Sequence, residues 1–245
     1  MRVVAIRKHD GRPKFNPSNT HLHRLLSAVE LSEGIRRQAS FFIFMYNSQM
    51  MATSSSKDWA NVHNSLDSLR GACTSAGLAT PYIVILHASP NEAQTIMRLV
   101  AADAISNYIS AIPTHLPTSY VALDTFVQGY WAQMASTGAP MVPICMTGWD
   151  PRARIEYSLA TNGEPKPRAT MSDYVIAGTP QQIAAHIQAA ARFTLSDPAV
   201  CPAKTILIYS WDECTEGGSA LIPSYTAAGP DRGILEAVSK VLSSG

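Results

Sequence analysis

The stretch ILIYSWDECTEGG, residues 206–218, joins an apolar run to a tryptophan and a group of acidic residues. Its apolar half is rich in β-branched residues and has no polar alternation, which is typical of a strand covered on both faces in a parallel sheet. Trp211, Asp212 and Glu213 follow this strand, and Glu216 comes three residues after Glu213. Functional groups of parallel α/β folds gather at the carboxyl ends of strands, so the stretch marks both the fold class and a candidate site.

Similar apolar runs recur along the chain and alternate with helical patterns. Helices are predicted at two hydroxyl-Pro-x-Glu/Gln signatures, Ser89–Glu92 and Thr179–Gln182, where the hydroxyl residue is the N-cap. Three further helices are predicted over residues 58–76, 120–137 and 232–242, and strands over residues 40–46, 81–87, 103–108, 140–148 and 204–210, with room for one more in VVAI at residues 3–6. This order predicts right-handed βαβ units, built as a barrel or as an open doubly wound sheet. The sequence has no G-x-G-x-x-G and no P-loop, which favours the barrel.

The chain is short for a complete barrel. Five strands are predicted between residues 40 and 210, and at about 30 residues for a βα unit the 39 residues before them hold at most one more, which gives about five or six units. We therefore predict an α/β fold of the (β/α)8 TIM-barrel type, incomplete because its N-terminal strands are missing. It forms a single domain, residues 1–245, with residues 1–39 poorly assigned. An open sheet edge at residues 40–46 predicts a homo-oligomer formed through that edge.

Composition excludes several classes of partner. The formal net charge is +1 and only 15% of the residues are charged, so no basic surface for nucleic acid or an anionic membrane is expected. No apolar stretch has the roughly 18 residues of a membrane-spanning helix. The start shows no signal peptide, and a cytoplasmic location is expected by default. The four cysteines are widely separated and are expected to be reduced.

Two carboxyl groups close together suit the cleavage of a sugar. On the predicted strand, Tyr209, Trp211 and Glu213 share one face, and Glu216 returns beside Glu213 if the chain turns helically. One carboxyl of such a pair protonates the leaving oxygen and the other acts on the opposite reaction partner. Acidic clusters after a strand are also typical of helix N-caps and solvated loops. The tryptophans favour the sugar interpretation, because Trp149 also follows a predicted strand and precedes an acid.

A resemblance to a known family rests on these two stretches. PMVPICMTGWDPRAR, residues 140–154, followed by ILIYSWDECTEGG resembles the glycoside hydrolase family 99-like proteins, the group that includes WbsX-type proteins and endo-α-mannosidases. Their corresponding motifs read approximately P-x-x-P-x-x-x-x-G-W-D-x-R-P-R and W-N-E-W-x-E-G. The resemblance extends over about residues 38 to 242. This chain departs from the motifs at Ala153, Asp212 and Cys214, where the family usually has Pro, Asn and an aromatic residue.

The resemblance implies a (β/α)8 barrel, a glycan substrate and roles for individual residues. Glu213 would assist the sugar's 2-hydroxyl as nucleophile and Glu216 would act as general acid/base, giving retention through an anhydro-sugar. The predicted substrate-binding residues are Trp149, Asp150, Arg152, Trp211, Asp212 and Tyr209.

Three functions remain open at this point. The first is a retaining glycoside hydrolase acting on a mannoside-like or bacterial polysaccharide substrate. The second is a non-catalytic carbohydrate-binding or polysaccharide-assembly protein with a degenerate or truncated barrel. The third is a Ca²⁺ or Mg²⁺ site built from Asp150, Asp212, Glu213 and Glu216, which the lack of a D-x-D-x-D loop disfavours. No metal and no cofactor are therefore predicted.

Overall fold

The computed structural model describes residues 2–5, 42–46, 56–108, 116–156, 170–209, 216–217 and 220–243. Contacts divide the chain into two compact units. We call Met1–Lys8 with Ser106–Gly245 the C-terminal unit, and His9–Ile105 the N-terminal unit. The candidate site lies in the C-terminal unit.

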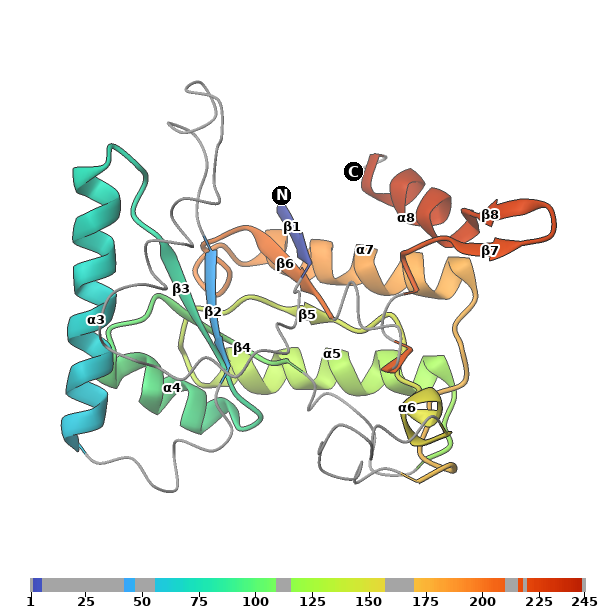
Figure 1. Ribbon diagram of the computed structural model, residues 1–245, viewed down its shortest axis with the longest axis horizontal. Coiled ribbons are helices and arrows are strands. Elements are labelled where there is room, and N and C mark those ends of the chain that lie inside the picture. The colour runs from blue at the N-terminus through green and yellow to red at the C-terminus, as the bar shows by residue number, and fades with distance from the viewer. Residues whose placement is uncertain are drawn as a thin grey trace. The chain divides into compact units, whose positions relative to one another are not determined.

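The C-terminal unit is built on a parallel three-stranded sheet with the order β1-β6-β5 (Figure 1). Strands β1 (Arg2–Ala5) and β5 (Ile144–Cys145) both pair in parallel with the central strand β6 (Thr205–Ile208). Every residue of β6 is buried, as expected for a strand covered on both faces. The predicted strands at residues 3–6, 140–148 and 204–210 are thereby confirmed, although β5 is only two residues long.

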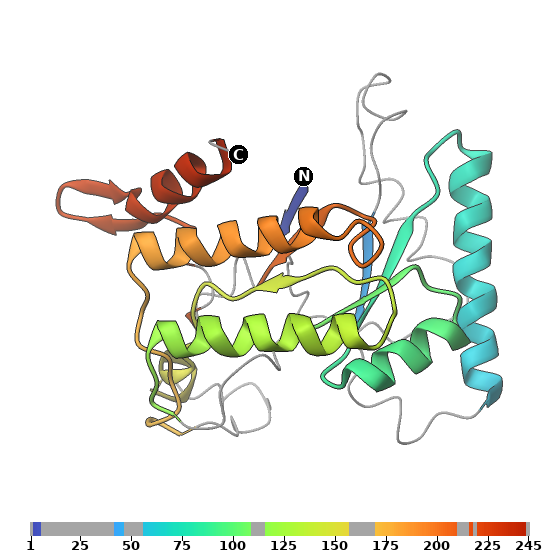
Figure 2. The same cartoon turned by 180° about the vertical axis from the view of Figure 1, so that it is seen from behind.

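Two long helices pack against β5 and against each other. Figure 2 shows α5 (Tyr120–Ser136) and α7 (Pro180–Ser196) side by side, with β5 running between them in that view. Their buried residues recur at helical spacing and include Leu123, Val127 and Trp131 in α5 and Ile183 and Ile187 in α7. Helix α8 (Gly233–Ser243) packs on α7.

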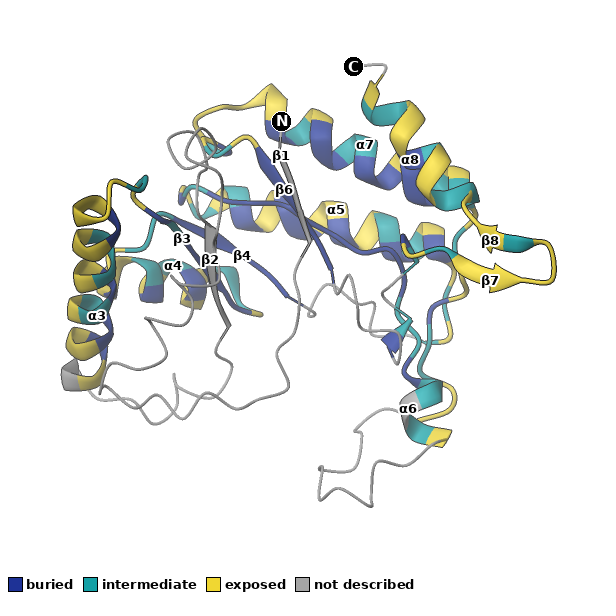
Figure 3. Cartoon of the chain, turned by 45° about the horizontal axis from the view of Figure 1, so that its top comes forward, coloured by how far each residue is buried: buried dark blue, intermediate teal, exposed yellow. Residues whose placement is uncertain are grey.

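Smaller elements of the C-terminal unit were not predicted. They are the short helix α6 (Arg152–Glu156) and the antiparallel hairpin of β7 (Ser224–Thr226) and β8 (Gly229–Asp231). The β7–β8 hairpin is largely exposed (Figure 3), so it has no apolar alternation in its sequence from which a strand is recognised.

The N-terminal unit holds the second three-stranded sheet, with the order β2-β3-β4. Its strands are β2 (Phe42–Tyr46), β3 (Tyr82–Leu86) and β4 (Ala104–Ser106), which ends at the unit boundary. Its helices are α3 (Ser56–Ser75) and α4 (Pro90–Leu99). All five elements correspond to elements predicted from the sequence.

The two predicted capping boxes differ in the structure. At Thr179 both reciprocal bonds form: the Gln182 N–H donates to the Thr179 hydroxyl, and the Thr179 N–H donates to the Gln182 side chain. At Ser89 the hydroxyl accepts the Glu92 N–H, but the Glu92 carboxylate lies 3.3 Å from Nε2 of His87. The capping function of Ser89 is confirmed. The Glu92 side chain contacts His87, the residue that follows β3.

The described strands lie in separate sheets and do not close into a barrel within the described ranges. The prediction that the barrel lacks its N-terminal strands and the assignment of residues 1–245 to one domain both stay predictions. Across the part of the chain that the structure covers, no helix combines the length and the apolar character needed to cross a membrane.

Candidate functional site

Two short segments meet where β5 and β6 end. Neighbouring parallel strands bring their carboxyl ends to the same edge, which places residues 148–150 beside residues 216–217. The Asp150 N–H donates to the Glu216 carbonyl oxygen at 2.6 Å. Gly217 has a φ of +62°, and a Cβ at this position would lie 2.9 Å from the Cβ of Asp150. The close approach therefore requires glycine at position 217.

The Glu216 carboxyl group is buried and held by a tyrosine. Glu216 is 6% exposed and Tyr209, directly after β6, is fully buried. The Tyr209 hydroxyl donates to Oε2 of Glu216. The Tyr108 ring packs on the Tyr209 ring with a centroid separation of 5.3 Å. The orientation of the Glu216 carboxyl group is thus set by a tyrosine whose own ring is fixed by packing.

Asp150 and Arg152 form a bidentate pair at the start of α6. Arg152 Nε donates to Oδ1 of Asp150 at 2.8 Å and Nη2 donates to Oδ2 at 2.6 Å. The guanidinium lies 3.7 Å from the centroid of the Tyr174 ring, a cation–π arrangement. The hydrogen bonds from the Arg152 side chain lower the pKa of Asp150 and outweigh the effect of its partial burial. Asp150 therefore remains ionised, and its carboxylate is neutralised locally by Arg152.

Trp149, which directly precedes Asp150, is half-buried. Its carbonyl oxygen accepts the Val175 N–H at 2.8 Å, and Val175 forms an isolated parallel bridge with Thr118. The indole Nε1 is buried, and no described residue accepts its hydrogen bond. Within the described part of the chain, the Trp149 indole is therefore a buried donor without an acceptor.

The structure brings together five of the eight residues predicted from the sequence: Trp149, Asp150, Arg152, Tyr209 and Glu216. The other three, Trp211, Asp212 and Glu213, lie outside the described residues, as does Cys214. The predicted proximity of Glu213 and Glu216 therefore stays a prediction. Described residues contain no group of three or more His, Cys, Asp or Glu side chains that would hold a metal ion.

Sequence reasoning missed Tyr174 and the hydrogen bond from Tyr209 to Glu216, while the binding of substrate by Tyr209 stays a prediction. Tyr174 lies in an irregular segment between α6 and α7 and carries no motif, so its contact with Arg152 depends on the tertiary fold. Tyr209 was predicted to bind substrate, and its described contact is with Glu216. The alternation of side chains along residues 204–210 predicts the face on which Tyr209 lies, but it does not show which group the Tyr209 hydroxyl contacts.

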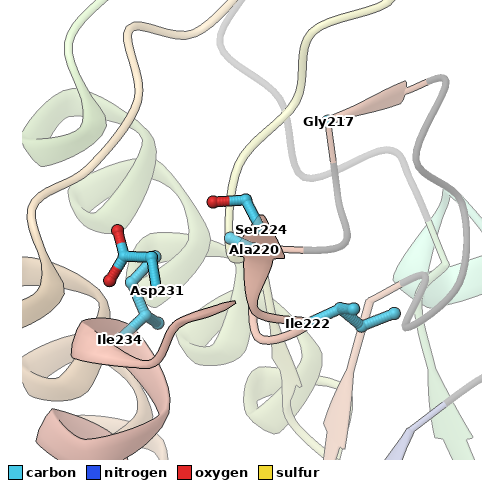
Figure 4. A pocket seen from close by; sticks show the side chains of 6 residues that line it. All are labelled: Gly217, Ala220, Ile222, Ser224, Asp231 and Ile234. Carbon is cyan, nitrogen blue, oxygen red and sulfur yellow. The ribbon is translucent and has the colours of Figure 1, made fainter. Parts of the chain in front are cut away.

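An open pocket of about 310 Å³ adjoins the site residues at Gly217. Figure 4 shows the side chains that line it, from the segment after Gly217, the β7–β8 hairpin and the start of α8. The lining residues are Gly217, Ala220, Ile222, Ser224, Asp231 and Ile234. The pocket thus combines two isoleucines with one hydroxyl and one carboxylate, and it begins one residue after Glu216.

Comparison with models of protein families and with curated proteins gives no match. Among solved structures, the chain is similar to the GH99 endo-α-mannosidase of Bacteroides thetaiotaomicron in complex with bis-tris-propane, with a TM-score of 0.50 and 14% identity over 100% of this chain and 72% of that chain. A second structure of the GH99 endo-α-mannosidase from Bacteroides thetaiotaomicron gives a TM-score of 0.48 and 12% identity over 98% of this chain and 65% of that chain. The first likeness supports a fold relationship to the GH99, TIM-barrel-type glycoside hydrolases.

Proposed function

We propose that this protein is a retaining glycoside hydrolase that acts on a mannoside-like or bacterial polysaccharide substrate. The observation that carries the proposal is the buried Glu216 carboxyl group, which the Tyr209 hydroxyl orients, in a residue whose backbone carbonyl accepts the Asp150 N–H. A carboxyl group fixed near the carboxyl end of a parallel strand suits cleavage of a glycosidic bond. The fold relationship to GH99 endo-α-mannosidases supports the same class of substrate.

In this proposal the two glutamates have different tasks. Glu213 takes the proton of the sugar's own 2-hydroxyl, whose oxygen attacks the anomeric carbon with inversion to form an anhydro-sugar, and Glu213 returns the proton to that oxygen when the anhydro-sugar opens. Glu216 protonates the leaving oxygen and then takes a proton from the water that opens the anhydro-sugar with a second inversion, so the net result is retention. No metal ion or cofactor enters these steps.

The substrate-binding role is assigned to the residues around this pair. The rings of Trp149 and Trp211 offer flat apolar faces to the sugar, and the buried indole N–H of Trp149 supplies a donor. Asp150, Arg152 and Asp212 supply hydrogen bonds to sugar hydroxyls. Tyr209 contributes by holding the Glu216 carboxyl group in place.

A non-catalytic carbohydrate-binding protein is the second candidate. The departures from the GH99-like motifs at Asp212 and Cys214 favour it, because they change both neighbours of Glu213. The two candidates share a glycan ligand and differ in turnover.

The test is a cleavage assay with the two glutamates replaced one at a time. The purified chain is incubated with a panel of α-mannans and bacterial polysaccharides, and new reducing ends are measured. We expect cleavage by the wild type, and loss of cleavage in Glu213→Gln and Glu216→Gln with the fold retained by circular dichroism. Glu236→Gln, an exposed glutamate on α8, is the matched control and should cleave at the wild-type rate.

Wild-type cleavage rates in both site variants would contradict the assignment of the pair. Binding of a glycan without new reducing ends, measured by calorimetry on the wild type, would favour the carbohydrate-binding candidate instead. Absence of both binding and cleavage over the whole panel would contradict both.

A further inference from the structure

Met146 follows β5 and precedes Trp149 by three residues, and side chains from two helices bind both of its backbone polar groups. Its N–H donates to Nε2 of His186 on α7 at 3.1 Å. Its carbonyl oxygen accepts the hydroxyl of Tyr120 on α5 at 2.8 Å. Met146 is fully buried, so water does not replace either partner. The direction in which the chain leaves β5 toward the candidate site is therefore set by α5 and α7.

His186 performs this function in one protonation state only. Its Nδ1 lies 2.6 Å from Oδ1 of Asp124, and a carboxylate accepts hydrogen bonds, so Nδ1 carries the proton. Its Nε2 accepts the Met146 N–H and must therefore present a lone pair. The two hydrogen bonds together require the tautomer with a proton on Nδ1 and a lone pair on Nε2. A proton on Nε2 would place two hydrogen-bond donors, Nε2–H and the Met146 N–H, opposite each other and remove this hydrogen bond.

Among the groups that surround His186, Asp124 carries the charge and the acceptor oxygen that select this tautomer. His186 is 1% exposed, with the Trp131 ring stacked on it at 5.4 Å and the Tyr120 ring edge-on at 6.3 Å. Burial raises the pKa of the Tyr120 hydroxyl and of the Cys145 thiol on β5, so both groups stay neutral. Asp124 also accepts a hydrogen bond from Gln128 at 2.7 Å, which holds the carboxylate in place on α5.

We infer that Asp124 is a positioning residue for the candidate site: it fixes His186 in the Nδ1-protonated tautomer, which holds Met146 and orients residues 147–150 against residues 216–217. The structural part stands on the hydrogen bonds among Asp124, His186 and Met146. The consequence for catalysis rests on the proposed function. The Asp150 N–H donates to the Glu216 carbonyl oxygen, and we expect this contact to weaken when Met146 is released.

The direct test measures the tautomer of His186 in the full chain by ¹⁵N NMR, with His186→Gln used to assign its signals. We expect the proton on Nδ1 in the wild type and in Asp124→Asn, because the Asn oxygen still accepts from Nδ1. Asp124→Leu removes the acceptor, and we expect protonation to move to Nε2. A wild-type His186 with its proton on Nε2 would overturn the inference without any variant, and an unchanged tautomer in Asp124→Leu would do the same.

A second measurement follows the segment itself by hydrogen exchange and mass spectrometry. Exchange over residues 146–150 should be faster in Asp124→Leu than in Asp124→Asn. Asp197→Leu is the matched control, because the Asp197 carboxylate also accepts two hydrogen bonds, here from the Ala199 and Val200 N–H groups, but lies at the C-terminal end of α7. It should destabilise the chain without a selective change over residues 146–150. Equal exchange there in both leucine variants would contradict a positioning role.

The third measurement joins the inference to catalysis. For a glycan that the wild type cleaves, Asp124→Leu should lower kcat/KM by about 10- to 100-fold, the range for displacement of catalytic groups, while Asp124→Asn stays close to the wild type. Equal kcat/KM values in the two variants would overturn the inference and leave the proposed function intact. A wild type that neither binds nor cleaves glycans contradicts the proposed function, whereas the tautomer and exchange results still decide the structural part.

Discussion

Glu216 occupies a buried position that few acidic side chains tolerate without a partner, and Tyr209 is the partner described here. The hydroxyl of Tyr209 satisfies one carboxyl oxygen, and the Tyr108 ring keeps the Tyr209 ring from turning away. The candidate site therefore consists of hydrogen-bonded pairs of side chains. Tyr209 donates to Glu216, and Arg152 donates to Asp150.

Replacing Tyr209 with phenylalanine should separate this pairing from ring packing. Tyr209→Phe keeps the ring and removes the donor to Glu216, so we expect the free energy of unfolding to fall by about 1–3 kcal/mol, the range for loss of a partner to a buried polar group. Urea denaturation followed by fluorescence measures it. Tyr225→Phe, at a tyrosine that is 87% exposed, is the control and should leave stability unchanged. Equal stabilities of the two variants would mean that the bond contributes nothing.

The Asp124 carboxyl group should make stability depend on pH in the acid range. Partial burial raises its pKa, but the interactions with His186 and Gln128 together outweigh this effect, and the pKa lies below its ordinary value of 3.8. As the pH falls, the unfolded chain takes up this proton first. The stabilising contribution is therefore complete above about pH 4 and is lost as the pH falls through the folded-state pKa.

Asp124→Asn tests this dependence, because asparagine does not titrate. We expect the variant to lose less unfolding free energy than the wild type between pH 7 and pH 3, as measured by urea denaturation at each pH. Thr125→Ala, an exposed neighbour on α5 without a titratable group, should keep the wild-type dependence. Parallel curves for the wild type and Asp124→Asn would contradict the assignment.

At the scale of elements, much of the C-terminal unit follows from local signals. The Thr179–Pro180–Gln182 signature predicts the start of α7 because each capping partner is a near neighbour in sequence, and both reciprocal bonds are formed. The Ser89 signature predicts its helix equally well but not the contact between Glu92 and His87, which depends on how β3 ends. The β7–β8 hairpin and Tyr174 were missed because exposed strands of three residues and irregular segments carry no periodicity.

The contact between residues 148–150 and 216–217 depends on Gly217. Gly217→Ala meets two penalties: the positive φ, and a Cβ at 2.9 Å from the Asp150 Cβ. Gly138→Ala meets only the first, because its φ is +72° and nothing lies within 4 Å of the added Cβ. We expect Gly217→Ala to cost about 1–3 kcal/mol more than Gly138→Ala in urea denaturation, the range for overpacking. Equal costs would show that the two segments separate freely.

At the scale of the whole molecule, the alternation of apolar runs and helical patterns was sufficient to predict six of the strands, β1 to β6, and the class α/β. It did not predict how the strands group. Pairing joins residues far apart in sequence, such as Val3 with Ile206, and no local pattern specifies it. The missing nucleotide-binding motifs and the motif resemblance both favoured a TIM-barrel-type fold, and the likeness to a solved structure supports that fold relationship.

The order β2-β3-β4 places β2 at one end of its sheet among the described strands. A strand edge without a partner tends to pair with another chain, so the prediction of a homo-oligomer is retained. Sedimentation velocity over a range of protein concentrations should show a sedimentation coefficient that rises with concentration. A constant monomer value over the whole range would contradict it.

Three cysteines among the described residues are free and buried in different elements: Cys73 in α3, Cys145 in β5 and Cys201 between α7 and β6. Burial raises the pKa of all three, that of Cys201 to about 11, so each thiol reacts with an alkylating reagent only when its surroundings open. The chain therefore carries its own reporters of opening. Pulsed alkylation followed by peptide mass spectrometry would measure the alkylation rate of Cys73, Cys145 and Cys201 separately. Equal rates that track global unfolding are the behaviour of one cooperative domain, and a faster rate at Cys73 alone would reveal an N-terminal unit that opens independently.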